Sequence, residues 1–226
     1  FGTFIDDLSA YAKYITYVNY CEQQNLFAIT CVSGSGTGYN GYAVFSSPDN
    51  IFNPTNWVPK ANIQSIVGTN EHRDAYFPGD GLLYIAVKDT STGYGKILTV
   101  NPETGAIATV YTTSYVLSSA AATSQTYISA DSYYVYVAFC TDNGYYKVVR
   151  GHAATGFSEI YSVAEVGYGG SYEKHGHIMP ISRDLALFGN INDANPASYY
   201  RLLNVSGSYA VELETYSGIT VHFTDC

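Results

Sequence analysis

Short runs of alternating apolar and polar residues, separated by glycine, proline, asparagine and aspartate, follow one another along most of the chain. The stretch from Leu83 to Tyr111 shows the pattern most clearly, because three strand-like runs are separated by two sharp reversals. Alternation with a period of two indicates half-buried strands, and the separating residues are those that tight turns need. No stretch keeps apolar residues at spacings of three, four and seven over three helical turns, so little helix is expected. The pattern predicts an all-β protein.

The second of these reversals recurs at a near-constant interval. The pairs Thr104-Gly105, Thr155-Gly156 and Ser206-Gly207 place their glycines 51 residues apart, and Thr55-Asn56 stands 49 residues before the first pair. Glycine and asparagine enter the left-handed backbone region most easily, so a positive φ is expected at these four turns. Recurrence of one turn indicates four units of about 50 residues, because a hairpin that buries one face needs a stacked neighbour to bury the other.

Units of this length with four short strands each predict a β-propeller of four-stranded antiparallel blades. The predicted units cover residues 13–62, 71–113, 125–163 and 175–216, within a single propeller domain over residues 1–226. Residues 217–226 are expected to form an extra or closing strand, and the units form either a small closed ring or part of a larger one. A β-sandwich is the alternative, although it would not require the turn to recur at equal intervals.

Two local motifs resemble known propeller repeats. The segment LTVNPETGAIATVY, residues 98–111, resembles blades of YVTN and quinoprotein-like propellers, in which Asn or Asp, a short turn and Thr-Gly separate the last two strands. Ser47-Pro48-Asp49 followed by Thr55-Asn56-Trp57 is similar to the Asp-box turn of sialidase-like propellers, with residues inserted and the glycine absent. These resemblances imply a fold and no particular activity.

Composition restricts the classes of partner. Charged residues make up 13% of the chain, and the net charge is −9 with ten unclustered lysines and arginines, which argues against nucleic-acid binding. No run of eighteen apolar residues occurs, so no membrane span is expected. The chain contains 24 tyrosines, which suit strands and also offer rings with a polar tip. This composition resembles β-domains of phage tail proteins and secreted adhesins, and it predicts an extracellular or virion surface.

The ends and the cysteines allow further expectations. The chain starts at Phe1, which suggests a processed protein or a piece of a longer one. In a hairpin around Gln23 and Gln24, the positions of Cys21 and Cys31 are offset by five residues, about 17 Å along a strand, so no bridge is expected between them. A bridge between the other two cysteines, Cys140 and Cys226, stays open. No metal-spaced cysteine set is present, and no cofactor is predicted.

Polar residues on the first strands of units two and four are the candidate site. In a propeller the first strand of each blade lines the central channel, which would bring these residues to a common place. They are predicted to bind a ligand: His72, Arg73, Asp74, Glu173, His175 and His177. His175 and His177 share a strand face by alternation, but paired histidines on such strands more often hydrogen-bond than hold a metal, so no metal site is predicted.

Three functions are compatible with these features. The favoured one is a non-catalytic binding or structural propeller that recognises a glycan or a protein surface through tyrosine-rich loops. A propeller-type glycoside hydrolase with a sialidase-like site is the alternative, and it would use Asp74 and Glu173 as carboxylates roughly 5 to 10 Å apart. A purely architectural subunit of a larger assembly is the third.

Overall fold

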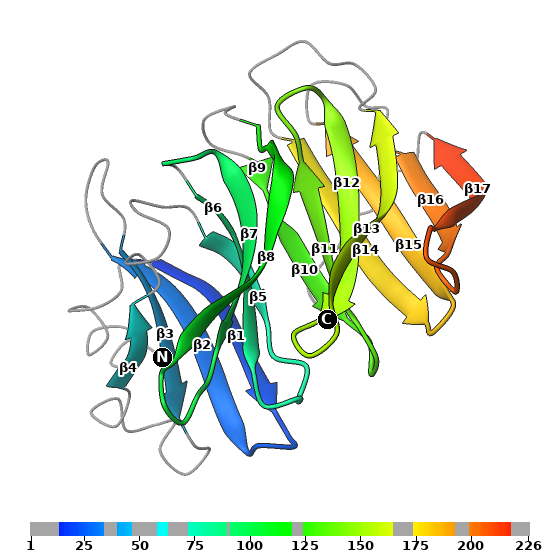
Figure 1. The fold of residues 1–226 in the computed structure, drawn as a ribbon. Helices are drawn as coiled ribbons and strands as arrows, with labels where there is room; N and C mark the ends of the chain where they lie inside the picture. Colours follow the sequence, from blue (N-terminus) through cyan, green and yellow to red (C-terminus); the bar gives the residue numbers. More distant parts are fainter. Residues whose placement is uncertain are drawn as a thin grey trace. The chain divides into compact units, whose positions relative to one another are not determined.

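The computed structural model describes residues 14–33, 40–46, 58–62, 72–89, 91–118, 124–164, 174–192 and 199–217. These residues form strands joined by turns (Figure 1). The strands of the N-terminal half are β1 (Tyr14–Cys21), β2 (Leu26–Ser33), β3 (Asn40–Ser46), β4 (Val58–Asn62), β5 (His72–Tyr76), β6 (Leu83–Lys88), β7 (Tyr94–Val100) and β8 (Ile107–Val116). Those of the C-terminal half are β9 (Ser124–Gln125), β10 (Tyr127–Ala130), β11 (Val135–Cys140), β12 (Tyr145–His152), β13 (Gly156–Ala164), β14 (Lys174–Ser182), β15 (Leu185–Asn192), β16 (Tyr199–Asn204) and β17 (Val211–Ser217).

The strands form four antiparallel sheets in which consecutive strands are neighbours. Their orders are β1-β2-β3-β4, β5-β6-β7-β8, β10-β11-β12-β13 and β14-β15-β16-β17. The last sheet gains a fifth strand, because the short β9 pairs in parallel with the start of β14. The predicted all-β class and the four-stranded antiparallel units are therefore confirmed. The sheets fall into two compact units, residues 1–116 and 117–226, and a single propeller domain over residues 1–226 stays a prediction.

The second strands of two sheets are apolar on both faces. Every residue of β11 is buried, and β6 is buried except at its last residue. Strands buried on both faces read as continuous apolar runs, whereas strands with one solvated face alternate. The fourth strands are more exposed: β13 alternates between exposed and more buried residues at both ends, and β17 is exposed along its whole length.

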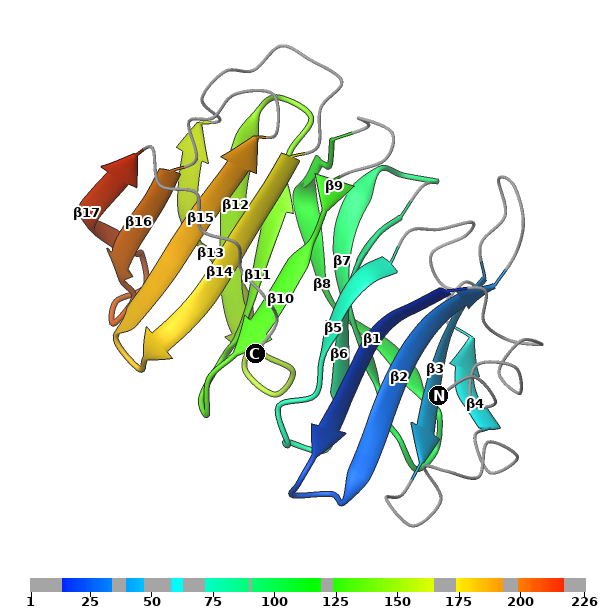
Figure 2. The ribbon, with the colours of Figure 1, turned by 180° about the vertical axis from the view of Figure 1, so that it is seen from behind.

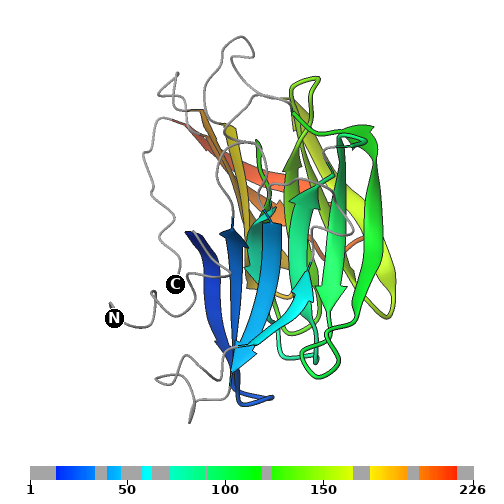
Figure 3. The same cartoon turned by 90° about the vertical axis from the view of Figure 1, so that its left-hand side faces the viewer.

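Each unit has its own core between two sheets. In the first unit, Cys21 and Ala28 from β1–β4 pack against Ala75, Leu83 and Ile85 from β5–β8; Figure 3 shows these sheets as two layers. The core of the second unit lies between β10–β13 and β14–β17, with these buried members: Tyr136, Ala138, Cys140, Tyr146, Val148, Ile160, Ile178, Ala186, Phe188, Leu203 and Val205. Burial of this apolar area is the main favourable term in folding each unit.

Two buried tyrosines at repeat-equivalent positions are anchored in the same way. Tyr84 and Tyr136 are fully buried on the second strands of their sheets. The Tyr84 hydroxyl donates to Asp80 Oδ2 at 2.6 Å, and the Tyr136 hydroxyl donates to Asp131 Oδ2 at 3.2 Å. Burial, together with the nearby Asp131 charge, raises the pKa of Tyr136 to about 12. An aspartate in the preceding turn thus satisfies a hydroxyl that would be costly to leave unpaired in the core.

The recurring turn is only partly uniform. Gly105 and Gly156 have φ values of 71° and 83°, as predicted. Gly207 does not have a positive φ, so that prediction is wrong for the fourth unit. There Asn204 Oδ1 accepts the N–H and the hydroxyl of Ser206 at 3.0 and 2.7 Å, and this side-chain turn reverses the chain without a left-handed glycine. The fourth position, Asn56, lies outside the described residues.

Several other expectations fall at the edges of the described regions. Both Asp-box-like segments lie outside them, as does the extra strand expected within 218–223. Cys21 lies opposite Leu26 and Cys31 lies opposite Ile15, so the predicted register offset is confirmed and the two cysteines are too distant to bridge. The partner considered for Cys140, Cys226, is also outside the described residues.

Two glycines flank the turn between β12 and β13, and substitution should affect stability differently at each of them. A Cβ on Gly151 would lie 2.2 Å from the carbonyl oxygen of Gly156 and 2.5 Å from Cα of Phe157, both backbone atoms that cannot move aside cheaply. Gly151→Ala is therefore expected to lower the free energy of unfolding by about 1 to 3 kcal/mol, as overpacking does. Urea unfolding followed by circular dichroism measures this change.

Gly156→Asn is the matched control. Gly156 has a positive φ but no atom within 4 Å of a Cβ, and asparagine tolerates the left-handed region. This variant should lose less than about 1 kcal/mol. An unfolding free energy for Gly151→Ala equal to that of the wild type would contradict the close approach of β12 and β13 at this point.

Candidate functional site

The first group of predicted site residues lies on β5, an edge strand of its sheet. His72 pairs with Val87 and Asp74 pairs with Ala86, so a bulge falls at Arg73 between them. Bulges at sheet edges re-aim side chains and are frequent beside binding sites. The backbone therefore bulges at Arg73, between the other two residues of this group, and their role in lining a site stays a prediction.

The second group lies on β14, in the second compact unit. The register of β14 with β15 is regular from Lys174 to Pro180, which puts His175 and His177 on one face of the strand. His177 is half-buried, and its ring lies 3.5 Å from the ring of Tyr127 on β10, centroid to centroid. Glu173 lies outside the described residues. Grouping of these residues with those on β5 stays a prediction.

No cluster of three or more histidine, cysteine, aspartate or glutamate side chains suited to a metal ion occurs among the residues that the structure describes. The loop that contains the acidic residue Asp142 and the neighbouring Asn143 is closed by hydrogen bonds of Thr141. The Thr141 hydroxyl donates to Asn143 Oδ1 at 2.5 Å and accepts the Tyr145 N–H at 2.9 Å. These contacts hold the β11–β12 hairpin.

The described regions contain no helix of the length and apolarity needed to cross a membrane.

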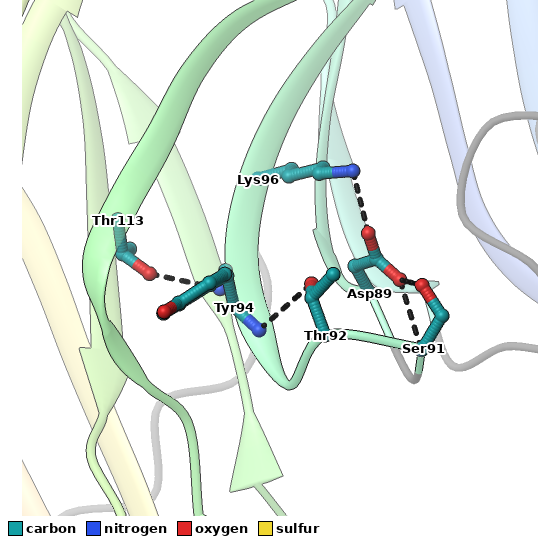
Figure 4. A network of polar contacts seen from close by, with 7 residues as sticks. Asp89, Ser91, Thr92, Tyr94, Lys96 and Thr113 are labelled. Carbon is teal, nitrogen blue, oxygen red and sulfur yellow. Dashed lines mark hydrogen bonds and ion pairs between the residues drawn. The ribbon is translucent and has the colours of Figure 1, made fainter.

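The most strongly perturbed carboxylate of the described residues is Asp89, at the β6–β7 turn (Figure 4). Its Oδ2 accepts from Lys96 Nζ at 2.6 Å, and its Oδ1 accepts from the Ser91 hydroxyl and N–H at 2.6 and 2.9 Å. Burial alone would raise the pKa of Asp89, but the hydrogen bonds from Lys96 and Ser91 outweigh it and lower the pKa to about 2. A carboxylate held ionised by this many donors stabilises the turn and is a poor general acid or base.

A second buried network joins the outer strands of the second unit. Arg201 on β16 is buried, and its Nη1 donates to Asn190 Oδ1 at 2.6 Å while its Nε lies 3.4 Å from Glu212 Oε2. The hydroxyl of Tyr161 on β13 donates to the same Oε2 at 3.0 Å. The hydrogen bond from Thr215 lowers the pKa of Glu212, and burial with the Glu212 contact raises the pKa of Tyr161. Tyr161 therefore serves in this network as a hydrogen-bond donor to Glu212.

A sequence signal that was not part of the sequence-based prediction marks the cations of these two networks and a third paired cation, Lys147. A tyrosine begins the third strand of three sheets and is followed two residues later by a cation, in the pairs Tyr94 with Lys96, Tyr145 with Lys147, and Tyr199 with Arg201. Each of these cations is paired with a carboxylate: Lys96 with Asp89, Lys147 with Glu159 and Arg201 with Glu212. This repeated motif therefore builds ion pairs inside the sheets and leaves these cations unsuited to ligand capture.

Tyrosine and arginine side chains gather at one end of the second unit, where three turns lie close together. We name this the hairpin surface; its members are Tyr133, Tyr134, Arg150, Arg183 and Tyr209. The guanidinium of Arg183 lies 5.0 Å from the ring centroid of Tyr133, and that of Arg150 lies 4.6 Å from the ring centroid of Tyr134. Tyr133 is 54% exposed and Tyr209 is 74% exposed. Figure 1 shows the β10–β11, β14–β15 and β16–β17 turns at the same end of this unit.

Backbone and side-chain bonds hold these turns in place. Asp131 Oδ1 accepts the N–H groups of Tyr133 and Tyr134, both at 2.7 Å. Arg150 donates to the carbonyl oxygen of Val205 and, at 2.7 Å, to that of Gly207. The Val205 N–H donates to the carbonyl oxygen of Asp184 at 2.8 Å. The hairpin surface is thus a set of aromatic and cationic side chains on turns that are already ordered.

Comparison with solved structures places the fold. The chain is similar to a chain of the nidogen/laminin complex (TM-score 0.56, 9% identity, covering 91% of this chain and 64% of that one). It is also similar to the WD40 domain of Toxoplasma gondii coronin (TM-score 0.55, 10% identity, 90% and 46%) and to the β-propeller domain of the trilobed protease from Pyrococcus furiosus (TM-score 0.51, 9% identity, 90% and 58%). No protein-family model matches the chain, and no curated protein matches its sequence.

The four-stranded antiparallel sheets and these propeller neighbours define the class of protein: the fold is a β-propeller. The chain spans between about half and two thirds of the length of the structures it matches. At identities of 9 and 10% the likeness concerns the fold alone, because propellers serve many unrelated functions. The function must therefore be argued from this chain's own surface.

Acid titration tests the role assigned to Asp89. A carboxylate whose pKa is about 2 in the folded chain and about 3.9 in the unfolded chain stabilises the fold above pH 4. That contribution, about 2 kcal/mol, is lost as the pH falls from 4 towards 2. Asp89→Asn is expected to lose it already at pH 7 and to show a flatter dependence of unfolding free energy on pH in this range.

Glu103→Gln is the control, since Glu103 is an exposed carboxylate in the β7–β8 turn. It should match the wild type at pH 7 and follow the same acid profile. If Asp89→Asn and the wild type instead lost stability in parallel between pH 4 and pH 2, the ion pair with Lys96 would not be the source of the acid dependence.

Proposed function

We propose that this propeller is a non-catalytic binding module that recognises glycans through the hairpin surface. The observation that carries the proposal is the exposure of Tyr133 and Tyr209 at 54% and 74%, beside the arginine that stacks on Tyr133. An exposed tyrosine ring offers an apolar face that packs on the C–H groups of a sugar and a hydroxyl that hydrogen-bonds its polar groups. Arg183 and Asp184, both exposed, add a donor and an acceptor beside the rings.

The turns that carry the exposed tyrosines are held by hydrogen bonds, and this favours a role in binding. Binding costs free energy when loops and side chains must first be ordered, and a preformed site avoids part of that cost. Here Asp131 fixes the turn that carries Tyr133, and Arg150 fixes the turn that carries Tyr209. Both rings are therefore presented by restrained backbone.

A display role fits the same features. The low share of charged residues and the abundance of tyrosine agree with the expectation of an extracellular or virion surface, where a glycan or protein surface would be the partner and the chain would form part of a larger assembly. The propeller fold supports this role by providing rigid sheets that present turns at their ends. The YVTN-like turn and the Asp-box-like segment add nothing to the choice of ligand.

Substitution of the two exposed rings tests glycan recognition. Wild-type protein is expected to bind a subset of an immobilised glycan array, and isothermal titration with the best glycan gives its dissociation constant. Tyr133→Ala combined with Tyr209→Ala should weaken that binding by roughly tenfold or more, because stacked aromatic contacts are each worth on the order of 1 kcal/mol. The free energy of unfolding should change little, since both rings are largely exposed.

Tyr145→Ala is the matched control. Tyr145 is 41% exposed but begins β12, at the end of the sheet opposite the β10–β11 turn. This variant should bind as the wild type does. Absence of any bound glycan for the wild type, or equal binding by the double variant, would refute the proposal.

The hydrolase alternative makes a different prediction for the carboxylates on the first strands. Under the binding proposal, Asp74→Ala and Glu173→Ala leave glycan binding unchanged, and neither the wild type nor the variants release a fluorophore from a panel of fluorogenic glycosides. Under the alternative, the wild type hydrolyses at least one glycoside and both variants lose about 10³-fold or more of that activity, as removal of an essential carboxylate does. Measured release of the fluorophore therefore decides between the two.

A further inference from the structure

In both units, one face of the earlier sheet in the chain packs against one face of the later sheet. In the second unit, Ala138 and Val148 of sheet β10–β13 face Ile178 and Phe188 of the next sheet along the chain, β14–β17. In the first unit, Cys21 and Ala28 of sheet β1–β4 face the next sheet, β5–β8. Within each unit, the earlier sheet packs through the face that we call its forward face on the face that we call the rear face of the later sheet. The opposite faces are the rear face of the earlier sheet and the forward face of the later sheet.

The forward face of β14–β17 carries exposed apolar side chains beyond His177, whose ring packs on Tyr127 of β10. Ile178 and Phe188 lie on the buried rear face, so their strand neighbours Met179 and Leu187 lie on the forward face. Met179, Leu187 and Leu202 are paired across three strands. Met179 is 42% exposed. Ile181 lies at a bulge between Pro180 and Ser182, so alternation does not assign its side chain to this face. Figure 2 views the second unit from this side, with β14, β15 and β16 in front of β10–β13.

The rear face of β1–β4 is apolar in the same way. Cys21 and Ala28 point to the core of the first unit, so Val18, Tyr20 and Phe27 lie on the opposite face by alternation and pairing. Val18 is 53% exposed and Tyr20 is 39% exposed, and the rings of Tyr20 and Phe27 pack at 4.8 Å, centroid to centroid. Large apolar side chains grouped on one sheet face indicate an interaction surface.

The two exposed faces are the complementary halves of one interface. One is a forward face and the other is a rear face, and a forward face packs on a rear face in each unit. Two identical faces would give an isologous contact, whereas two different faces give a head-to-tail contact between copies.

We infer that the forward face of β14–β17 in one copy of this chain packs on the rear face of β1–β4 in a second copy. Association then continues the sheet-on-sheet packing that each unit already shows, with Met179 and Leu202 against Val18, Tyr20 and Phe27. None of these residues belongs to the hairpin surface, so failure of this inference would leave the proposed glycan site standing.

Charge substitution on each face tests this inference. The 226-residue chain is expected to sediment as a dimer or larger species at micromolar concentration. Met179→Glu and Val18→Glu each place a carboxylate in the proposed apolar contact and should weaken association by about tenfold or more. Met179 is 42% exposed and Val18 is 53% exposed in the chain, so thermal unfolding should confirm that each variant folds. Tyr145→Glu, which alters an exposed residue outside both faces, should associate as the wild type does.

Mixing the two variants distinguishes a head-to-tail contact from every other kind. The Met179→Glu chain keeps an intact rear face and the Val18→Glu chain keeps an intact forward face, so an equimolar mixture should form a heterodimer while each variant alone is monomeric. A wild-type chain that is monomeric up to about 100 µM, where a specific interface with a dissociation constant of micromolar order would be saturated, overturns the inference. So does a mixture that stays monomeric. Closure of the two faces within one chain would give the first of these results.

Discussion

A four-stranded sheet has two faces, and in this protein the described sheets bury their apolar faces against other sheets of the same kind. The cores of both units consist of side chains from two sheets packed face to face. A single hairpin or a single sheet would leave half of these side chains in water, so no unit of about 50 residues is expected to be stable alone. This constraint explains the repeat, the apolar second strands and the direction of packing. It also explains why an exposed sheet face carrying Met179 calls for a partner.

Polar groups inside the sheets follow a second constraint, which is that each must find a partner close by. Asp80 and Asp131 accept from buried tyrosine hydroxyls, and Asp89 accepts from Lys96 and Ser91. The cost of an unpaired buried group is larger than the net gain from a typical hydrogen bond, so such pairs are kept where the turns can supply them. Groups committed in this way are not free to act on a ligand. Among the described residues, the exposed rings of Tyr133 and Tyr209 and the exposed guanidinium of Arg183 remain available for recognition.

Much of the architecture could be predicted from local patterns. Alternation located the strands, and the spacing of Gly105 and Gly156 located two of the repeated reversals, because positive φ values restrict which residues can occupy these positions. The same reasoning failed at Gly207, since the side chain of Asn204 makes an alternative turn there. It also missed β9, whose two residues pair with β14 of the following sheet; a strand this short has no periodicity to detect.

The sequence by itself determined the all-β class, the four-stranded unit and its repeat, because strand periodicity and turn chemistry act over a few neighbouring residues. It did not determine the hairpin surface. Tyr133 and Arg183 are fifty residues apart in the chain, and they meet because the two sheets of the second unit pack with their turns at the same end. Only the tertiary structure decides which faces meet, since burial depends on the partner that covers a residue and no local pattern encodes that partner.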